Sequence, residues 1–180
     1  DLKGKFVAGY MGTIGLAHSL ETLVEAAKEL QNQPKGQGVS IVIIGDGAKK
    51  REIRELIDIQ NLRNILILDS IPKSAVPSYL SLFDVSIIHL AKRDLFKTVI
   101  PSKLFETMAV GIPVLFGVEG ESRDVVLEHS VGVVFEPENS KERAQLLLEL
   151  KDDEAKLSQL KFNALNAAGH FSRSTLANRM

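Results

Sequence analysis

Short apolar runs alternate with amphipathic segments along the chain. The runs are rich in β-branched residues, and the second is nearly continuous, as expected for a strand buried on both faces of a sheet. We therefore predict six strands, at FVAGY (6–10), VSIVIIG (39–45), ILIL (65–68), VSIIHL (85–90), VLF (114–116) and VGVVF (131–135). In the segments between them, apolar residues recur at the spacing of one helix face.

These segments predict the helices that connect the strands. The first two carry apolar stripes at Leu20, Leu23, Val24, Ala27 and Leu30, and at Ile53, Leu56 and Ile57. Further helices are predicted at 74–83, inside PSKLFETMAVGIPVL (101–115), at 122–129 and after residue 140, where Leu157, Leu160, Ala164 and Ala168 share a stripe. A polar loop of about ten residues at 91–101 is long for a compact domain, and long loops are often functional.

Strand and helix alternate six times, so each crossover contains a helix and neighbouring strands should run parallel. The predicted fold class is α/β, with a doubly wound, mostly parallel, six-stranded Rossmann-like sheet and carboxyl-terminal helices. We expect residues 1–180 to form one domain, with 140–180 as a terminal helical layer of it. Both ends of the sequence suggest a domain that belongs to a longer protein.

Composition removes several classes of function. With 22 basic and 23 acidic side chains, the net charge of −1 argues against non-specific nucleic-acid binding. The absence of cysteine excludes disulfides and thiolate metal sites, and it fits a cytoplasmic protein. No apolar run approaches the roughly 18 residues of a membrane span, and no signal peptide opens the sequence.

In an open α/β sheet, ligands bind outside the carboxyl ends of the strands, so the loops that follow the strands matter most. The first, GYMGTIGLAHS (9–19), contains Gly12 and Gly15, which either approach a phosphate or form a tight turn. The second, GDGAKK (45–50), ends in Lys49 and Lys50. Cations oppose the dipole at a helix start, which favours phosphate binding over a solvated first turn.

The fourth loop, AKRDLFKTVIPSK (91–103), places Lys92, Arg93, Lys97 and Lys103 around one acid, Asp94. It is either an anion site at the mouth of the next helix or a solvated basic loop. Ser102 and Glu106 share one side of that helix. Glu106 either interacts favourably with the helix dipole or accepts hydrogen bonds from a vicinal diol such as ribose.

The fifth loop, GVEGESRD (117–124), offers Gly120 and Glu121, either as a structural turn or as a ligand loop. The histidines do not predict a metal site, because none of them has metal-ligand spacing with another; they are His18, His89, His129 and His170. No nucleophile elbow supports Ser-His-Asp catalysis.

Taken together, GYMGTIGLAHSLETLVEAAKEL, IIGDGAKKREI, TVIPSKLFETMAVGIPVL, GVEGESRDVV and VGVVFEPEN resemble family-4 glycosyltransferases. The resemblance is to the carboxyl-terminal, nucleotide-sugar-binding half of a GT-B enzyme, over nearly the whole chain. It is strongest to the bacterial subgroup that builds capsule, lipopolysaccharide and O-antigen, such as L-fucosamine transferases. PSKLFETMAVGIPVL is its most specific part.

The resemblance implies a retaining transfer of a hexose or N-acetylamino sugar, usually from a UDP-sugar, without a protein-bound metal or other cofactor. The acceptor, a glycan or a lipid-linked sugar, belongs to an amino-terminal half that this chain lacks. Catalytic residues therefore stay unassigned, and the isolated domain should fold without transferring sugar. We expect no nucleic-acid partner and a cytoplasmic location, at the inner face of the membrane through peripheral association.

The same resemblance assigns donor contacts. Glu106 matches the second of two glutamates in the family motif, which binds the donor ribose. Thr98 stands at the place of the first, so Asp94 or a backbone group substitutes there. Lys50 matches the lysine after G-x-G, and the diphosphate would meet Lys50, Lys103 and the amides near Gly12 and Gly15.

Ser102 completes this set of donor contacts, and Gly120 and Glu121 are possible further ones. Two other functions remain open on the sequence alone. The first is a nucleotide-sugar epimerase of the same architecture. The second is a nucleotide-binding module without chemistry.

Overall fold

The computed structural model describes residues 2–171. Its six strands form one sheet in the order β3-β2-β1-β4-β5-β6, with every neighbouring pair parallel. The strands are β1 (Phe6–Met11), β2 (Val39–Ile44), β3 (Ile65–Leu68), β4 (Val85–His89), β5 (Val114–Gly117) and β6 (Gly132–Val134). This confirms the predicted doubly wound, Rossmann-like α/β sheet.

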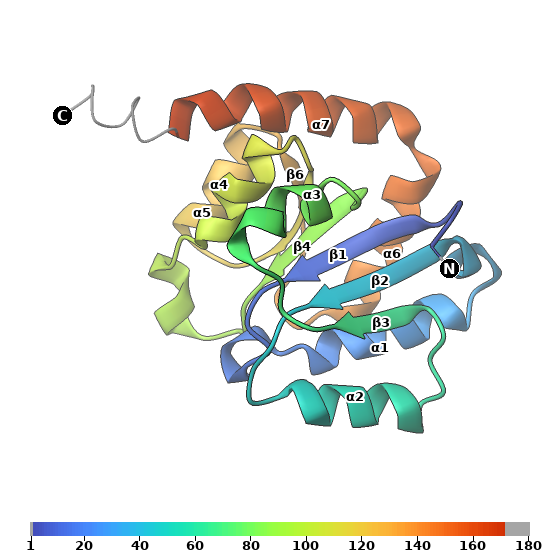
Figure 1. Ribbon diagram of the computed structural model, residues 1–180. Coiled ribbons are helices and arrows are strands. Elements are labelled where there is room, and N and C mark those ends of the chain that lie inside the picture. Colours follow the sequence, from blue (N-terminus) through green and yellow to red (C-terminus); the bar gives the residue numbers. More distant parts are fainter. Residues whose placement is uncertain (1, 172–180) are drawn as a thin grey trace.

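Helices cover both faces of the sheet (Figure 1). One face packs against α1 (Glu21–Gln31), α2 (Lys50–Ile59) and α6 (Ser140–Asp152). The other packs against α3 (Val76–Leu80), α4 (Ser102–Ala109), α5 (Glu121–Glu128) and α7 (Glu154–Ala168). The strands are buried on both faces, because their side chains point alternately toward the two helical layers.

Residues after 140 do not form one layer. Asp153 separates the two last helices, and its carboxylate accepts a hydrogen bond from the Lys156 amide to begin α7. Helix α6 packs beside α1, whereas α7 crosses to the other face and packs on α4. Gly111, with φ of 75°, lies against the Leu165 side chain at this crossing, where an added Cβ would come within 2.7 Å of it. The predicted layer at 172–180 lies outside the described residues.

Two predicted elements differ in detail. The helix expected at 74–83 is a 3₁₀ turn at Lys73–Ala75 followed by α3, which ends at Leu80. It stops early because the chain must turn into β4, where the Asp84 carboxylate accepts a hydrogen bond from the Val7 amide. The loop at 91–101 contains a 3₁₀ helix at Asp94–Thr98.

The order of strands creates one reversal of direction, between β1 and β4. The chain leaves β1 toward α1 on one face and leaves β4 toward α4 on the other, so a crevice opens between their loops. The arrowheads of β1, β2 and β3 all point to this edge in Figure 1.

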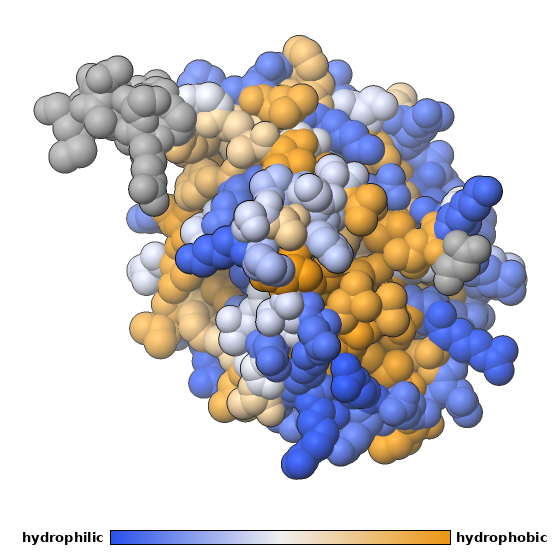
Figure 2. All heavy atoms as spheres, viewed as in Figure 1, coloured by the Kyte–Doolittle hydropathy of each residue, from blue (hydrophilic) through white to orange (hydrophobic). Residues whose placement is uncertain are grey.

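In the same view, Figure 2 shows apolar side chains where the strands reach the surface between the two helical layers. No helix within residues 2–171 is long and apolar enough to cross a membrane.

Candidate functional site

Helix α4 delivers Lys103 to the crevice. Pro101 precedes the helix with φ of −65°, and Leu104 and Met108 anchor one side of it in the core. Lys103 lies on the flank of this buried side, and its Nζ reaches 4.6 Å from the centre of the Tyr10 ring on β1. The same ammonium donates a 3.4 Å hydrogen bond to the Tyr10 hydroxyl. The lysine thus joins α4, which follows β4, to the end of β1.

Gly12, which follows β1, makes room for this lysine. Its φ of 146° favours glycine, and a Cβ at this position would lie 2.2 Å from the Lys103 Nζ. A side chain at position 12 would therefore displace the ammonium. The structure brings together two residues that are far apart in sequence, as expected for neighbouring loops at one sheet edge.

Within residues 2–171, the Lys103 ammonium forms no ion pair with a carboxylate. Burial lowers the pKa of Lys103 to about 8, against a smaller opposing effect of Glu106. Burial raises the pKa of Tyr10 and lowers that of His18 to about 4, where Lys103 adds to the effect. Near pH 7 the ammonium is therefore charged, and the Tyr10 and His18 side chains beside it are neutral, which suits an anion.

Three adjoining hollows run along this edge, of about 300, 260 and 430 Å³. The first is lined by Met11, Gly12, Ser70, Ile71 and Val76, among others. Lys103, Glu106 and Ser102 line the second, and Glu106 also lines the third. Glu106 is exposed and lines two of these hollows, whereas its contact with a ribose stays a prediction.

A larger hollow, of about 660 Å³, lies at the opposite edge of the sheet. Lys5, Gln37 and Asn64 are among the residues that line it, and none of the predicted site residues does. This hollow is larger, but it is not the candidate donor site, because ligands of open parallel sheets bind at the carboxyl ends of the strands.

The loops after β1 and β2 interlock. The Ile14 amide donates to the Asp46 carbonyl at 2.8 Å, and the Lys49 amide donates to the Ile14 carbonyl at 3.0 Å. An added Cβ on Gly45 would lie 1.9 Å from the Gly12 carbonyl oxygen, so close contact requires glycine there. Gly15 precedes the 3₁₀ turn Leu16–His18 and lines none of the three hollows, so its contact with a ligand stays a prediction.

Lys50 is held away from Lys103. Its Nζ lies 2.6 Å from Asp69 Oδ1 and 3.7 Å from Asp46 Oδ1, on the loops after β3 and β2. It lines none of the three hollows along the groove. A contact between Lys50 and a diphosphate stays a prediction, and it requires the ammonium to leave Asp69.

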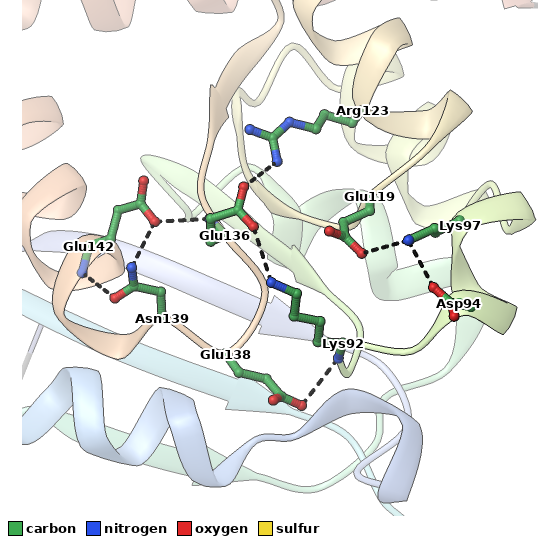
Figure 3. Close-up of polar contacts among 9 residues, drawn as sticks. All are labelled: Lys92, Asp94, Lys97, Glu119, Arg123, Glu136, Glu138, Asn139 and Glu142. Atoms are coloured by element: carbon green, nitrogen blue, oxygen red, sulfur yellow. Dashed lines mark hydrogen bonds and ion pairs between the residues drawn. The ribbon is translucent and has the colours of Figure 1, made fainter.

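The fourth and fifth loops form a separate polar group (Figure 3). Lys97 pairs with Asp94 at 2.8 Å and with Glu119 at 3.9 Å, and its hydrogen bond lowers the pKa of Asp94. Thr98 ends the 3₁₀ helix there, and its hydroxyl donates to the Leu95 carbonyl at 3.4 Å.

The remaining predicted contacts lie beside this group. Gly120, with φ of 82°, packs against the Lys97 carbonyl, and Glu121 begins α5. Neither of them, nor Asp94 or Thr98, lines the hollows beside Lys103. Their contacts with a ligand therefore stay predictions.

The sequence analysis assigned no role to two buried polar side chains that pack together, Tyr10 and His89. His89 packs 5.9 Å from Tyr10, and neither of its ring nitrogens has a hydrogen-bond partner within the described residues. Burial, with a smaller effect of Arg143, lowers its pKa well below the usual value. Tyr10 could have been identified from its position at the end of a strand. Between residues 2 and 171, no three His, Asp or Glu side chains are grouped to hold a metal ion.

Comparison with known proteins identifies relatives of this chain. A family model described as "Glycosyl transferases group 1" matches residues 2–167. "Putative colanic acid biosynthesis glycosyl transferase WcaI" of Escherichia coli (strain K12) is 31% identical over 102 residues, which is 57% of this chain and 24% of that protein. The 2-deoxystreptamine N-acetyl-D-glucosaminyltransferase of Streptomyces fradiae is 25% identical over 124 residues, 68% of this chain and 28% of that protein.

Among solved structures, Anabaena Alr3699/HepE in complex with UDP is similar with a TM-score of 0.83 and 19% identity, over 99% of this chain and 48% of that chain. The same Anabaena protein has been solved with UDP-glucose. At this identity, the likeness shows the fold alone. The match spans only about a quarter of the length of the two curated relatives.

Proposed function

The chain belongs to the group 1 glycosyl transferases, and on this premise we propose that it binds the nucleotide-sugar donor of the transfer reaction. One observation carries the proposal. Lys103, a half-buried ammonium that pairs with no carboxylate in the described part of the chain, lies at the carboxyl edge of the sheet beside Gly12, at the reversal between β1 and β4. A diphosphate supplies the anion that this arrangement lacks.

The hollows on either side suit the rest of a nucleotide. Glu106 lies one helical turn from Lys103, and its carboxylate accepts the hydrogen bonds of the ribose hydroxyls. The hollow lined by Ile71 and Val76 offers apolar walls to the base. UDP is the nucleotide we favour, because it is bound in the Anabaena structure.

In the proposed reaction, the diphosphate is the leaving group. Its negative charge grows in the transition state, and the Lys103 ammonium with the backbone amides near Gly12 and Gly15 stabilises that charge. We propose that the transfer retains the configuration of the sugar and needs no metal held by this chain. Residues outside the chain would supply the acceptor site, so the isolated chain binds the donor without transferring sugar.

We extend the proposal to the synthesis of cell-surface polysaccharide. The name of the Escherichia coli relative, with its reference to colanic acid, supports this class of acceptor. A hexose or an N-acetylamino sugar would be carried to a glycan or a lipid-linked acceptor. The reaction would take place at the inner face of the cytoplasmic membrane.

A titration with UDP, followed by backbone amide shifts, tests the proposal. We expect the largest shifts at Gly12, Gly15, Lys103 and Glu106, because the diphosphate and the ribose contact this edge directly. Residues after 140 serve as the internal control and should shift least. Shifts confined to α6 and α7, or none at all with UDP, GDP or ADP, would contradict donor binding.

The low pKa of Lys103 predicts a pH-dependent affinity. The free protein carries most of the charge that the diphosphate needs at pH 7 and about half of it at pH 8, so affinity for UDP should fall by no more than about twofold between these values. Above pH 8 binding must also return a proton to Lys103. The affinity should then fall by up to about tenfold for each pH unit.

Calorimetric titration between pH 7 and 9 measures this effect. Uridine, which has no phosphate, provides the control and should bind with little change over the same range. A constant UDP affinity up to pH 9 would show that the ammonium does not contact the diphosphate.

A further inference from the structure

Three loops meet at one carboxylate, Glu138, which follows β6. Its Oε1 accepts a 3.1 Å hydrogen bond from the Ser19 hydroxyl and a 3.2 Å hydrogen bond from the Lys92 backbone amide. Ser19 belongs to the loop after β1, and Lys92 to the loop after β4 (Figure 3 shows the Lys92 contact). These two loops lead to opposite faces of the sheet, and they are also joined directly by the Ala91 amide, which donates to the Ala17 carbonyl at 2.9 Å.

The backbone is strained where this contact forms. Glu138 has φ of 66° and Ser19 has φ of 40°, in the left-handed region that residues other than glycine rarely occupy. Such a conformation costs about 1 kcal/mol or more per residue and persists only where the surroundings hold it. The strain is therefore offset by contacts of these two residues and of their neighbours.

The segment that carries Glu138 is fixed from both sides. Asn139 begins α6 by accepting a hydrogen bond from the Glu142 amide at 3.1 Å, and Glu142 accepts one from the Glu136 amide at 2.9 Å. The Glu136 carboxylate in turn lies 3.1 Å from Arg123 Nη1 and 3.6 Å from Lys92 Nζ (Figure 3). Lys92 is thus held by its amide and by its side chain.

We propose that Glu138 is a positioning residue for donor binding, which holds the loops after β1 and β4 at a fixed separation across the crevice. The inference rests on the proposed function. Gly15 lies in the first of these loops, and the second leads to Lys103. Glu138 contacts no part of the groove itself, because it lines none of the three hollows. It acts by keeping the loops in the arrangement that a diphosphate requires.

The Glu138→Gly protein tests the proposal. Glycine relieves the left-handed strain while it removes the carboxylate, so thermal stability should change little. If the loops then adopt the binding arrangement only about a tenth of the time, affinity for UDP falls about tenfold. The Lys92 amide, which loses its acceptor, should exchange its hydrogen faster. The Glu138→Gln protein keeps an oxygen that accepts both hydrogen bonds and should bind UDP within about threefold of the unsubstituted protein.

Asn61→Gly is the matched control, because Asn61 has φ of 53° and lies at the opposite edge of the sheet. It should change neither UDP affinity nor Lys92 exchange. Unchanged UDP affinity in Glu138→Gly, or an unchanged Lys92 exchange rate, would overturn the positioning role. Failure of the unsubstituted protein to bind UDP would instead contradict the proposed function, and the exchange rate of Lys92 would still report whether the loops are held.

Discussion

The Glu106→Gln protein is expected to bind UDP about ten- to hundredfold more weakly than the unsubstituted protein. The substitution removes charge-assisted hydrogen bonds to the ribose hydroxyls, which contribute about 1.5–3 kcal/mol. Glu106 forms no hydrogen bond to another described side chain or backbone group, so its oxygens are available to a ligand. It is exposed and lines two of the hollows of the groove. Calorimetric titration with UDP measures the loss directly.

A 2′,3′-dideoxy analogue of UDP is the control for this assignment. Its ribose lacks the partner hydroxyls, so its affinity should be nearly the same for the Glu106→Gln and unsubstituted proteins. Lys103→Ala should have the complementary effect, weakening UDP far more than uridine, and this effect should shrink as salt is added. These comparisons separate the ribose contact from the diphosphate contact.

The alternative is that Glu106 only stabilises the helix. Its place in α4 weakens this alternative, because Glu106 is the fifth residue of the helix, beyond the first turn where the dipole acts strongly. If the dipole were its only role, the substitution would lower stability by up to about 1 kcal/mol and leave UDP affinity alone. A lowered melting temperature with an unchanged dissociation constant would reject the ribose contact.

The Arg143→Met protein is expected to be more stable than the unsubstituted protein by about 1–4 kcal/mol. Arg143 is fully buried at the start of α6, and its guanidinium nitrogens have no hydrogen-bond partner within the described residues. It lies 4.6 Å from the centre of the Phe135 ring, a contact that recovers only part of the cost of burying the charge. Methionine keeps the length and the contact with the ring but removes the charge.

The pH dependence of this gain has a definite sign. Burial lowers the pKa of Arg143 to about 9, so the folded state disfavours the charged form. The cost is complete below pH 9 and declines as the pH rises above 9, where the folded state releases the proton and the unfolded state keeps it. The gain in stability from Arg143→Met should therefore be larger at pH 7 than at pH 10.

Denaturant unfolding of both proteins at the two pH values measures this gain. Lys141→Met removes an exposed cation from the same turn of α6 and should change stability by less than about 0.5 kcal/mol. A loss of stability in the Arg143→Met protein would show that the guanidinium makes a net favourable interaction in the folded state.

The strands and their order along the chain could be predicted because β-branched runs such as VSIVIIG have few alternatives to a buried strand. The position of Gly12 at the carboxyl edge of the sheet could also be predicted, because Gly12 follows a predicted parallel strand. The pairing of Lys50 with Asp69 did not, since it depends on how close the loops after β2 and β3 come in space. A motif can place a lysine in a loop, but the nearest carboxylate then decides whether its charge is available.

The left-handed backbone of Glu138 and the burial of Arg143 also could not be predicted from the sequence pattern. Nothing in the residue type predicts a left-handed glutamate, because that conformation is disfavoured locally and is imposed by the Ser19 and Lys92 contacts. Likewise, an arginine in the first turn of a helix normally extends into solvent. Its burial over Phe135 follows from the packing of α6 beside α1, which brings together distant parts of the chain.

During synthesis on the ribosome, helix α4 emerges well before the helix that covers it. Ala164 and Ala167 of α7 pack into the same apolar cluster as Leu104 and Met108 of α4. At about 5–20 residues per second, α7 follows α4 by several seconds. Strands β5 and β6 are made within that interval, and until α7 follows them the outer apolar side of α4 stays open to chaperones and to other nascent chains. The packing of α4, the helix that carries Lys103, is therefore completed only when α7 has been made.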